Sequence, residues 1–413
     1  MNKTFCVFPF FNLNSNTDGS VKLCCNIRTN THVKDHNGRE FNLGKDHIDG
    51  IWYSSYMNDV RRNMIDGVEI KECQDCYKQE LTTGHSSRTS SNKFWLKKDH
   101  VQENINRFND HKKIKPVSSL ELRLGNTCNL SCNSCWGYSS SKVNEERIQL
   151  VSKPDLDQKF KNDWSTELKI PNEINKWFKT DQYRENIDSV SQTINRLYIT
   201  GGEPTLIKEN RTLLRNLLEK GNKDCFVSFT TNGTQADSEL LELLKEFPNN
   251  EIQISIDGVG DQAHYVRYPT DWKEFKINVD QLCAIPNVNI VFYTVVSAYN
   301  LFSIQEILKY VDSIASNRKV GWYPIFLDNP DYLHTYVWPM EIRERASQEL
   351  ANTVTHLNSL PQYVSKDVFD MLQQYLTQGS NNNNLEYFQK FNSTLDAKRG
   401  TDFNKTFPEL CLN

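Results

Sequence analysis

The chain has 413 residues, of which 48 are Lys or Arg and 52 are Asp or Glu, and its formal net charge is −4. This balance lacks the basic excess of proteins that bind a nucleic-acid backbone or an anionic membrane surface. No stretch approaches the roughly 20 apolar residues that span a bilayer, and the apolar run FCVFPFF is too short for a signal peptide. We therefore expect a soluble cytoplasmic protein that binds neither nucleic acid nor membrane.

The length predicts two or three domains, because a single core rarely exceeds about 250–300 residues. We expect a turn-rich and cysteine-rich domain over residues 1–95, with one helix near 54–66 that Gly67 ends. Residues 96–117 are predicted as a linker that is itself a polar helix in part.

Residues 118–330 alternate between predicted strands and amphipathic helices, and Ser238 is expected to cap one of these helices. The alternation predicts βαβ units and a parallel sheet, either open and doubly wound or closed as a partial barrel. The first connection, from 126 to 194, is too long for one crossover helix and predicts a loop followed by helices. The six predicted strands span 119–125, 195–201, 225–231, 251–257, 287–297 and 320–326.

Residues 331–413 are predicted as a helical extension. Two amphipathic helices are expected within 340–376, and a third helix follows a polar break, GSNNNN, at 379–384.

The chain contains 11 cysteines, and their number favours metal binding or catalysis because cytoplasmic thiols stay reduced. Cys225 and Cys283 lie among apolar residues and are interpreted as small core side chains. Cys411 has no assigned role.

Three cysteines, Cys128, Cys132 and Cys135, lie in the segment CNLSCNSC directly after the first predicted strand of the core. A structural zinc site usually takes four protein ligands. Three thiols on one short loop are instead typical of iron–sulfur ligation, in which a cubane cluster keeps one iron open for another ligand.

Polar motifs follow the later strands, at the strand ends where parallel α/β folds place their reactive sites. Two glycines allow a ligand to approach the backbone, a carboxylate can accept hydrogen bonds from an amine, and a guanidinium can bind a carboxylate. Taken singly, GGEP could be an ordinary turn, Asn232 a turn cap and Arg267 a salt-bridge partner. The candidate residues are Gly201, Gly202, Glu203, Pro204, Asn232, Ser255, Asp257 and Arg267.

The ordered set CNLSCNSC, GGEP, TTNG, SIDG and a following Arg resembles the radical S-adenosylmethionine (SAM) superfamily over roughly residues 118–327. The resemblance implies an α/β fold with a partial (βα)6 TIM-like barrel, here between a small cysteine-rich N-terminal domain and a C-terminal helical extension. It also implies that Cys128, Cys132 and Cys135 hold a [4Fe-4S] cluster and act in catalysis. The amino and carboxylate groups of SAM would then occupy the fourth iron.

The same resemblance implies roles for the other motif residues. GGEP would contact the SAM amino group, Ser255 and Arg267 its carboxylate, and Asn232 and Asp257 other polar groups of the cofactor. Trp136 would lie beside the cluster, and Val296 would pack against the adenine. A donor such as flavodoxin or ferredoxin would reduce the cluster, and a 5′-deoxyadenosyl radical would take hydrogen from a peptide or small-molecule substrate.

The N-terminal cysteines Cys6, Cys24, Cys73 and Cys76 could bind one metal centre, and their spacing alone favours zinc over [4Fe-4S]. The pattern of a Gly-x4-Cys turn followed by a Cys-x2-Cys pair resembles the SPASM/twitch domains, which implies an auxiliary [4Fe-4S] cluster. Such domains usually follow the core, whereas this one precedes it. Cys25 is a spare cysteine that could replace Cys24 as a ligand or lie buried. The alternatives are a structural zinc beside a radical SAM core and a non-catalytic metal-binding interaction protein.

Overall fold

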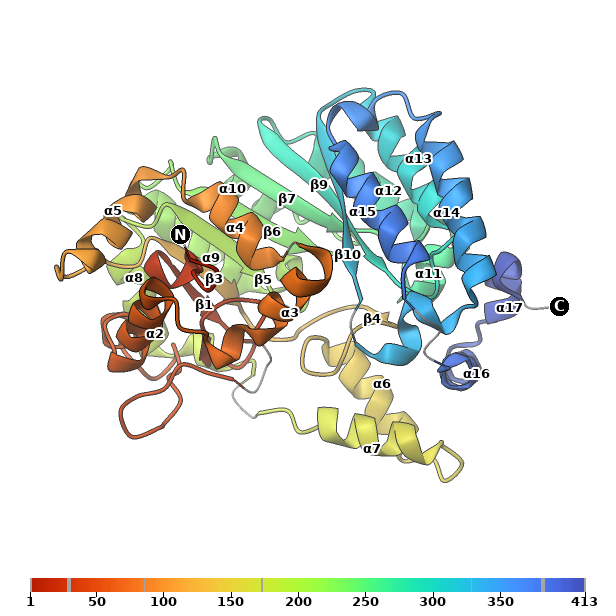
Figure 1. Ribbon diagram of the computed structural model, residues 1–413, viewed down its shortest axis with the longest axis horizontal. Helices are drawn as coiled ribbons and strands as arrows, with labels where there is room; N and C mark the ends of the chain where they lie inside the picture. The colour runs from red at the N-terminus through yellow and green to blue at the C-terminus, as the bar shows by residue number, and fades with distance from the viewer. Residues whose placement is uncertain are drawn as a thin grey trace. The chain divides into compact units, whose positions relative to one another are not determined.

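The computed structural model describes residues 2–27, 31–84, 86–171, 174–327, 329–379 and 383–411. The chain divides into two compact units (Figure 1). Unit 1 comprises residues 1–127, 170–228 and 246–249, and unit 2 comprises residues 128–169, 229–245 and 250–413. Part of the predicted break at 379–384, residues 380–382, lies outside the described residues.

The main sheet has eight strands in the order β10-β9-β7-β6-β5-β3-β1-β2. The pairs β1–β3, β3–β5, β7–β9 and β9–β10 are parallel, and β1–β2 is antiparallel. All six predicted strands are present, and the α/β class with a parallel sheet is confirmed, consistent with a partial TIM-like barrel. The strand bounds are β1 Asn12–Ser15, β2 Val21–Lys22, β3 Ser119–Arg123, β5 Arg196–Thr200, β6 Phe226–Thr231, β7 Asn250–Ser255, β9 Val288–Val296 and β10 Val320–Phe326.

Unit 1 places helices against the apolar face of its strands, where Leu13, Leu120 and Leu197 are buried. The predicted helix near 54–66 is α2: Ser54 caps it by accepting a hydrogen bond from the backbone N–H of Met57, and Gly67 ends it at a φ of 80°. The helices of unit 1 are α1 Ile48–Trp52, α2 Ser55–Asp66, α3 Gln74–Thr83, α4 Ser87–Trp95, α5 Asp99–Asn109, α8 Asp181–Val190 and α9 Lys208–Glu219.

Unit 2 carries the C-terminal helices, of which α13, α14 and α15 pack side by side next to β10 (Figure 1). The two helices expected within 340–376 and the third after the break are confirmed. Asp237, not Ser238, caps α10, since its carboxylate accepts a hydrogen bond from Leu240 N at 2.8 Å. The helices of unit 2 are α6 Ser141–Val151, α7 Gln158–Glu167, α10 Ser238–Lys245, α11 Asp261–Val266, α12 Trp272–Cys283, α13 Ile304–Ala315, α14 Met340–Val354, α15 Lys366–Thr377, α16 Leu385–Arg399 and α17 Phe403–Thr406.

Among the described helices, none combines the length and the apolar character that a bilayer crossing requires.

A partly buried histidine links the segment after β10 to α15. His334 Nδ1 accepts a hydrogen bond from Tyr336 N at 3.1 Å, and its Nε2 lies 2.8 Å from the hydroxyl oxygen of Tyr375. Burial, and then the nearby Arg343 charge, lower the pKa of His334 from 6.5 to about 4. The native chain therefore holds this imidazole neutral at a pH at which the unfolded chain protonates it.

We expect the free energy of unfolding to fall by about 1 kcal/mol between pH 7 and pH 5, after discounting the shift for partial exposure. The sign follows because the unfolded chain binds a proton below pH 6.5 that the native chain accepts only near pH 4. Urea unfolding of wild-type and His334→Gln protein at both pH values measures this difference. The exposed His356→Gln serves as control, and an equal pH dependence in all three proteins would contradict the expectation.

Candidate active site

The three-cysteine loop begins after β3 and is fixed by a short antiparallel ladder within unit 2. Strand β4, Ser131–Cys132, pairs with β8, Arg267–Tyr268, so that Cys132 lies opposite Arg267. Asn133 N donates to the carbonyl of Val266 at 2.9 Å, and Cys135 N donates to the carbonyl of Cys132 at 3.0 Å. The backbone is thereby turned tightly between Cys132 and Cys135.

The loop cysteines are partly buried. All three cysteines are free of disulfides. Burial raises the pKa of Cys132 to about 12 and that of Cys135 to about 11, while the positive charge of Arg267 opposes the rise at both. The nearby Cys128 also raises the pKa of Cys132 and that of Cys135, so the three cysteines lie close to one another. Thiolates formed here would be strongly stabilised by a bound cation, which is the chemistry of a metal-ligand set.

Arg267 and Asp257 form a buried ion pair behind the loop. Arg267 Nη1 lies 2.7 Å from Asp257 Oδ2, and the Asp257 side chain is 1% exposed. The other oxygen of Asp257 accepts a hydrogen bond from Val295 N at 2.7 Å. Burial disfavours the guanidinium charge, but Cys132 and then Asp257 raise the pKa of Arg267 above its usual value. Among the described residues, Arg267 Nε is buried without a hydrogen-bond partner, which leaves one donor for a ligand.

Asn232, at the end of β6, fixes the start of the cysteine loop. Its Nδ2 donates to Asn129 Oδ1 at 2.9 Å, and Asn129 Nδ2 donates to Thr234 Oγ1 at 2.8 Å. Asn232 Oδ1 in turn accepts from Thr234 N at 2.9 Å, so it also forms the turn cap considered from the sequence. The TTNG motif therefore orients the residue that follows Cys128.

The GGEP turn of unit 1 packs on the backbone that leads to Cys128. Gly201 has a φ of 123°, and a Cβ atom at Gly202 would lie 2.2 Å from the carbonyl oxygen of Thr127. Glu203 N donates to that same carbonyl at 2.7 Å. The Glu203 side chain is 1% exposed and accepts hydrogen bonds from the N–H and hydroxyl of Thr205, while Pro204 begins a 3-10 turn.

A second group of thiols lines one cavity in unit 1. Cys6, Cys24, Cys73 and Cys76, the four predicted ligands, all face this cavity together with Arg88. Burial raises the pKa of Cys6 to about 12 and raises those of the other three thiols. Cys25 is not among the lining residues of this cavity.

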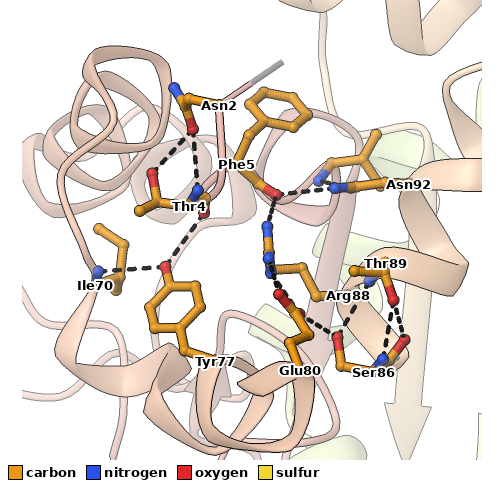
Figure 2. Close-up of polar contacts among 11 residues, drawn as sticks. Asn2, Thr4, Phe5, Ile70, Tyr77, Glu80, Ser86, Arg88, Thr89 and Asn92 are labelled. Atoms are coloured by element: carbon orange, nitrogen blue, oxygen red, sulfur yellow. Dashed lines mark hydrogen bonds and ion pairs between the residues drawn. The ribbon is translucent and has the colours of Figure 1, made fainter. Parts of the chain in front are cut away.

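Arg88 of α4, which lines this cavity, is fixed by polar contacts (Figure 2). Arg88 forms an ion pair with Glu80 of α3, and its Nη1 donates to the carbonyl of Phe5 at 2.6 Å. Asn92 also donates to Phe5 O, at 2.8 Å, and accepts from Val7 N at 2.9 Å. Two side chains thus fix the backbone on both sides of Cys6.

Within the described part of the chain, no group of three or more His, Cys, Asp or Glu side chains is arranged to hold a single metal ion. The thiolates of a four-iron cluster each bind a different iron, so a cluster site does not need its sulfur atoms to converge on one atom. Three partly buried thiols that form no disulfide, beside the unpaired Nε donor of Arg267, and four thiols around one cavity fit cluster ligation chemically.

Comparison with known proteins identifies the core. Residues 122–311 match the sequence model of the radical SAM superfamily. This part of the chain is a radical SAM domain. The match begins within β3 and ends within α13, so it contains the three-cysteine loop and all the strand-end motifs.

The chain is also similar to solved structures, but the likeness is low. SuiB from Streptococcus suis bound to S-adenosylmethionine is 11% identical with a TM-score of 0.37, covering 78% of this chain and 64% of that one. TYW1 with a lysine-pyruvate adduct is 14% identical with a TM-score of 0.28, covering 56% of this chain and 70% of that one. The chain thus spans slightly less than two thirds of the length of SAM-bound SuiB. No curated protein matches the sequence.

The remaining residues predicted for the radical SAM domain lie on its strand ends and loop. Ser255 is the last residue of β7, and Val296 ends β9 with its side chain fully buried. Trp136 follows Cys135 and stacks at a tilt on Tyr138, with 5.2 Å between ring centroids. Their contacts with a cofactor stay predictions.

Two arginines that hold the cysteine loop, and a glutamate that pairs with one of them, were missed from the sequence. Arg399, at the end of α16, donates to Asn133 Oδ1 at 2.6 Å and to the carbonyl of Ser131 at 2.7 Å. It also forms an ion pair with Glu146 of α6 at 2.6 Å, with the two side chains 4% and 11% exposed. Arg147 donates to the carbonyl of Cys135 at 2.9 Å. No local pattern marks Arg399, because its partners lie more than 250 residues away.

Replacing Gly202 by Ala should destabilise the protein by about 1–3 kcal/mol, because the new Cβ would displace the Thr127 carbonyl. The displacement should also lower the iron content of reconstituted protein. Urea unfolding and iron analysis measure the two effects. Gly50→Ala, in α1 with open space around its Cβ position, should stay within about 1 kcal/mol of wild type. Equal behaviour of the two variants would contradict the tight contact.

Arg399→Gln should cost about 3 kcal/mol of stability, because it leaves the buried Glu146 carboxylate without its partner. The freed loop should also expose its thiols, so that iodoacetamide alkylates Cys128, Cys132 and Cys135 faster in metal-free protein. Mass spectrometry of the alkylated peptides gives the rates. The exposed neighbour Lys398→Gln should change stability by less than about 0.5 kcal/mol. Unchanged alkylation in Arg399→Gln would show that the clamp does not control the loop.

Proposed function

We propose that the protein is a radical SAM enzyme that cleaves S-adenosylmethionine reductively and uses the resulting 5′-deoxyadenosyl radical to take hydrogen from a peptide or small-molecule substrate. The observation that carries the proposal is that three cysteines without disulfides, Cys128, Cys132 and Cys135, lie on one fixed loop inside the radical SAM match. When bound there, a [4Fe-4S] cluster would supply the electron for this cleavage.

The chain's own residues would position the cofactor. The three thiolates would leave one iron to the amino and carboxylate groups of SAM. The buried carboxylate of Glu203 would orient the amino group, and the unpartnered Nε of Arg267, with Ser255, would bind the carboxylate. Asp257 keeps Arg267 in place and Asn232 holds the loop, so these two residues act as positioning residues.

We propose that the four-thiol cavity of unit 1 holds an auxiliary [4Fe-4S] cluster in a twitch-like domain. Its four cysteines complete the ligand set of a cubane, which favours electron transfer or structural support over substrate ligation. Arg88 supports the proposal because it places a fixed positive charge in the cavity wall, where it would offset the charge of the thiolates. A cytoplasmic location and a flavodoxin- or ferredoxin-type donor would keep these thiols reduced and supply electrons.

The alternative centre in unit 1 is a structural zinc, for which Cys-x2-Cys spacing is also suitable. A protein that retains the core without turnover is the alternative of a different class. Identifying the bound metal distinguishes the structural zinc from our proposal. Measuring SAM cleavage distinguishes the protein without turnover.

Anaerobically reconstituted wild-type protein should bind roughly eight irons and form 5′-deoxyadenosine from SAM with dithionite. Cys128→Ala/Cys132→Ala/Cys135→Ala should bind roughly four irons and form no 5′-deoxyadenosine, because SAM would lose its iron site. Cys73→Ala/Cys76→Ala should also bind roughly four. Metal analysis and chromatography of the nucleoside measure these outcomes.

Cys225→Ala is the matched control: Cys225 is buried directly before β6 and outside both thiol groups, so its replacement should leave the iron content unchanged. Zinc in place of half the iron, lost on Cys73→Ala/Cys76→Ala, would establish the structural zinc instead. Protein with full iron but no SAM cleavage would establish the non-catalytic alternative.

A further inference from the structure

One face of the strands in unit 1 is polar although it is buried. Side chains alternate between the two faces of a strand, and the leucines of β1 and β3 take the helix-covered face. The register places Lys22 opposite Asn14, Asn14 opposite Glu121, and Glu121 opposite Tyr198, so these four residues form one row across β2, β1, β3 and β5. Lys22, Asn14 and Glu121 are each less than 5% exposed.

The neighbouring rows of the same face add two more cations. Arg123 lies two residues after Glu121, and Arg196 lies opposite Ser119. Together with Lys22 they give three positive charges against the single carboxylate of Glu121. That carboxylate is engaged by Arg123 at 3.1 Å. Lys22 is buried and the two arginines are partly buried, and an excess of positive charge in such surroundings is costly unless an anion compensates it.

The face also holds hydrogen-bond donors without acceptors. Asn12 Oδ1 accepts from Ser119 Oγ at 2.7 Å, and Asn14 Oδ1 accepts from Arg123 Nη1 at 3.1 Å. Because the amide oxygens make these bonds, the Nδ2 atoms of Asn12 and Asn14 point away from Ser119 and Arg123. Asn12 Nδ2 and Asn14 Nδ2 are buried without an acceptor within the part of the chain that the structure describes. Each such donor points to a missing acceptor, since buried donors are normally bonded.

Arg196 is held ready for a ligand. Its guanidinium carbon lies 5.5 Å from the ring centre of Trp95 and 5.1 Å from that of Tyr198, and its Nη1 donates to Ser119 Oγ at 3.2 Å. The rings fix the planar group while leaving other N–H donors for an anion. The Arg123 side chain is 20% exposed, so solvent reaches this face.

We propose that this polar face, formed by Asn12, Asn14, Lys22, Arg123 and Arg196, binds a carboxylate group of the substrate. A carboxylate supplies what the face lacks, namely negative charge and acceptor atoms that planar guanidinium and amide donors can reach. The inference rests on the proposed function and deepens it, because it assigns the substrate to the class of carboxylic acids. The alternative role for these cations is to balance thiolates of the neighbouring Cys24 and Cys25.

The test uses full-length, anaerobically reconstituted protein and equilibrium dialysis with radiolabelled glutarate as the probe. We expect one equivalent of glutarate to bind saturably below about 10 mM. The neutral isostere glutaramide should not displace it, because it lacks the negative charge. Wild-type protein that forms 5′-deoxyadenosine but binds no glutarate overturns this inference and leaves the proposed function intact. Wild-type protein that binds glutarate but does not cleave SAM overturns the proposed function and leaves the carboxylate site intact.

Variants locate the binding. Arg196→Gln should weaken glutarate binding at least about tenfold, because it removes a charge-assisted contact, and Arg196→Lys should restore part of it. Asn14→Asp builds a carboxylate into the row and should abolish binding. Arg184→Gln on α8, whose side chain is 65% exposed, is the matched control and should bind as wild type.

Two further outcomes would overturn the inference. Wild-type affinity in both Arg196→Gln and Asn14→Asp would place glutarate elsewhere. Wild-type affinity accompanied by a shifted reduction potential of the iron would assign the cations to the thiolates. Where Arg196→Gln does not fold, Arg196→Lys and Asn14→Asp decide the question.

Discussion

The site depends on one constraint: the backbone of the three-cysteine loop must be immobile while its thiols stay available. Hydrogen bonds to the loop come from Asn232 after β6, from Arg147 on α6 and from Arg399 on α16. They contact amide groups or carbonyls of the loop and no sulfur atom. A loop fixed in this way loses little conformational entropy when a cluster binds, so more of the ligation free energy remains for affinity.

The charges beside the loop are likewise held in place by groups other than the thiols. A lone guanidinium beside Cys132 would be costly to bury, and a lone carboxylate at Asp257 would be equally so. Paired at 2.7 Å, they place a positive charge close to the thiols while the Asp257 carboxylate is also bonded to β9 through Val295 N. The pair therefore favours thiolate formation at the loop without leaving an uncompensated ion in the unit.

The sequence predicts what is local and periodic. The six core strands are visible because β-branched and aromatic residues alternate over five to nine positions, and the strand-end motifs are contiguous. Strands β1 and β2 are not predicted from the sequence because they are too short to show a period. Arg399 is not predicted either, because the residues that it contacts lie more than 250 residues away in the sequence. The cysteine spacing identifies the four thiols around the unit 1 cavity, but Arg88 and Glu80 gain their role only from tertiary contacts. The predicted domain boundaries and cofactor contacts stay predictions.

The strand order explains how a cysteine group that precedes the core can be held as firmly as one that follows it. Cys24 lies two residues after β2, β2 pairs with β1, and β1 pairs in parallel with β3. The N-terminal segment is thus hydrogen-bonded as an edge of the core sheet, and it needs no separate docking surface. Because β3 also leads directly into the three-cysteine loop, one strand sets the backbone course toward both groups of thiols. Shifting β1 by one residue would exchange the faces of Asn14 and Leu13, placing an amide in the apolar core. Burial on one face therefore fixes the register that positions Cys24.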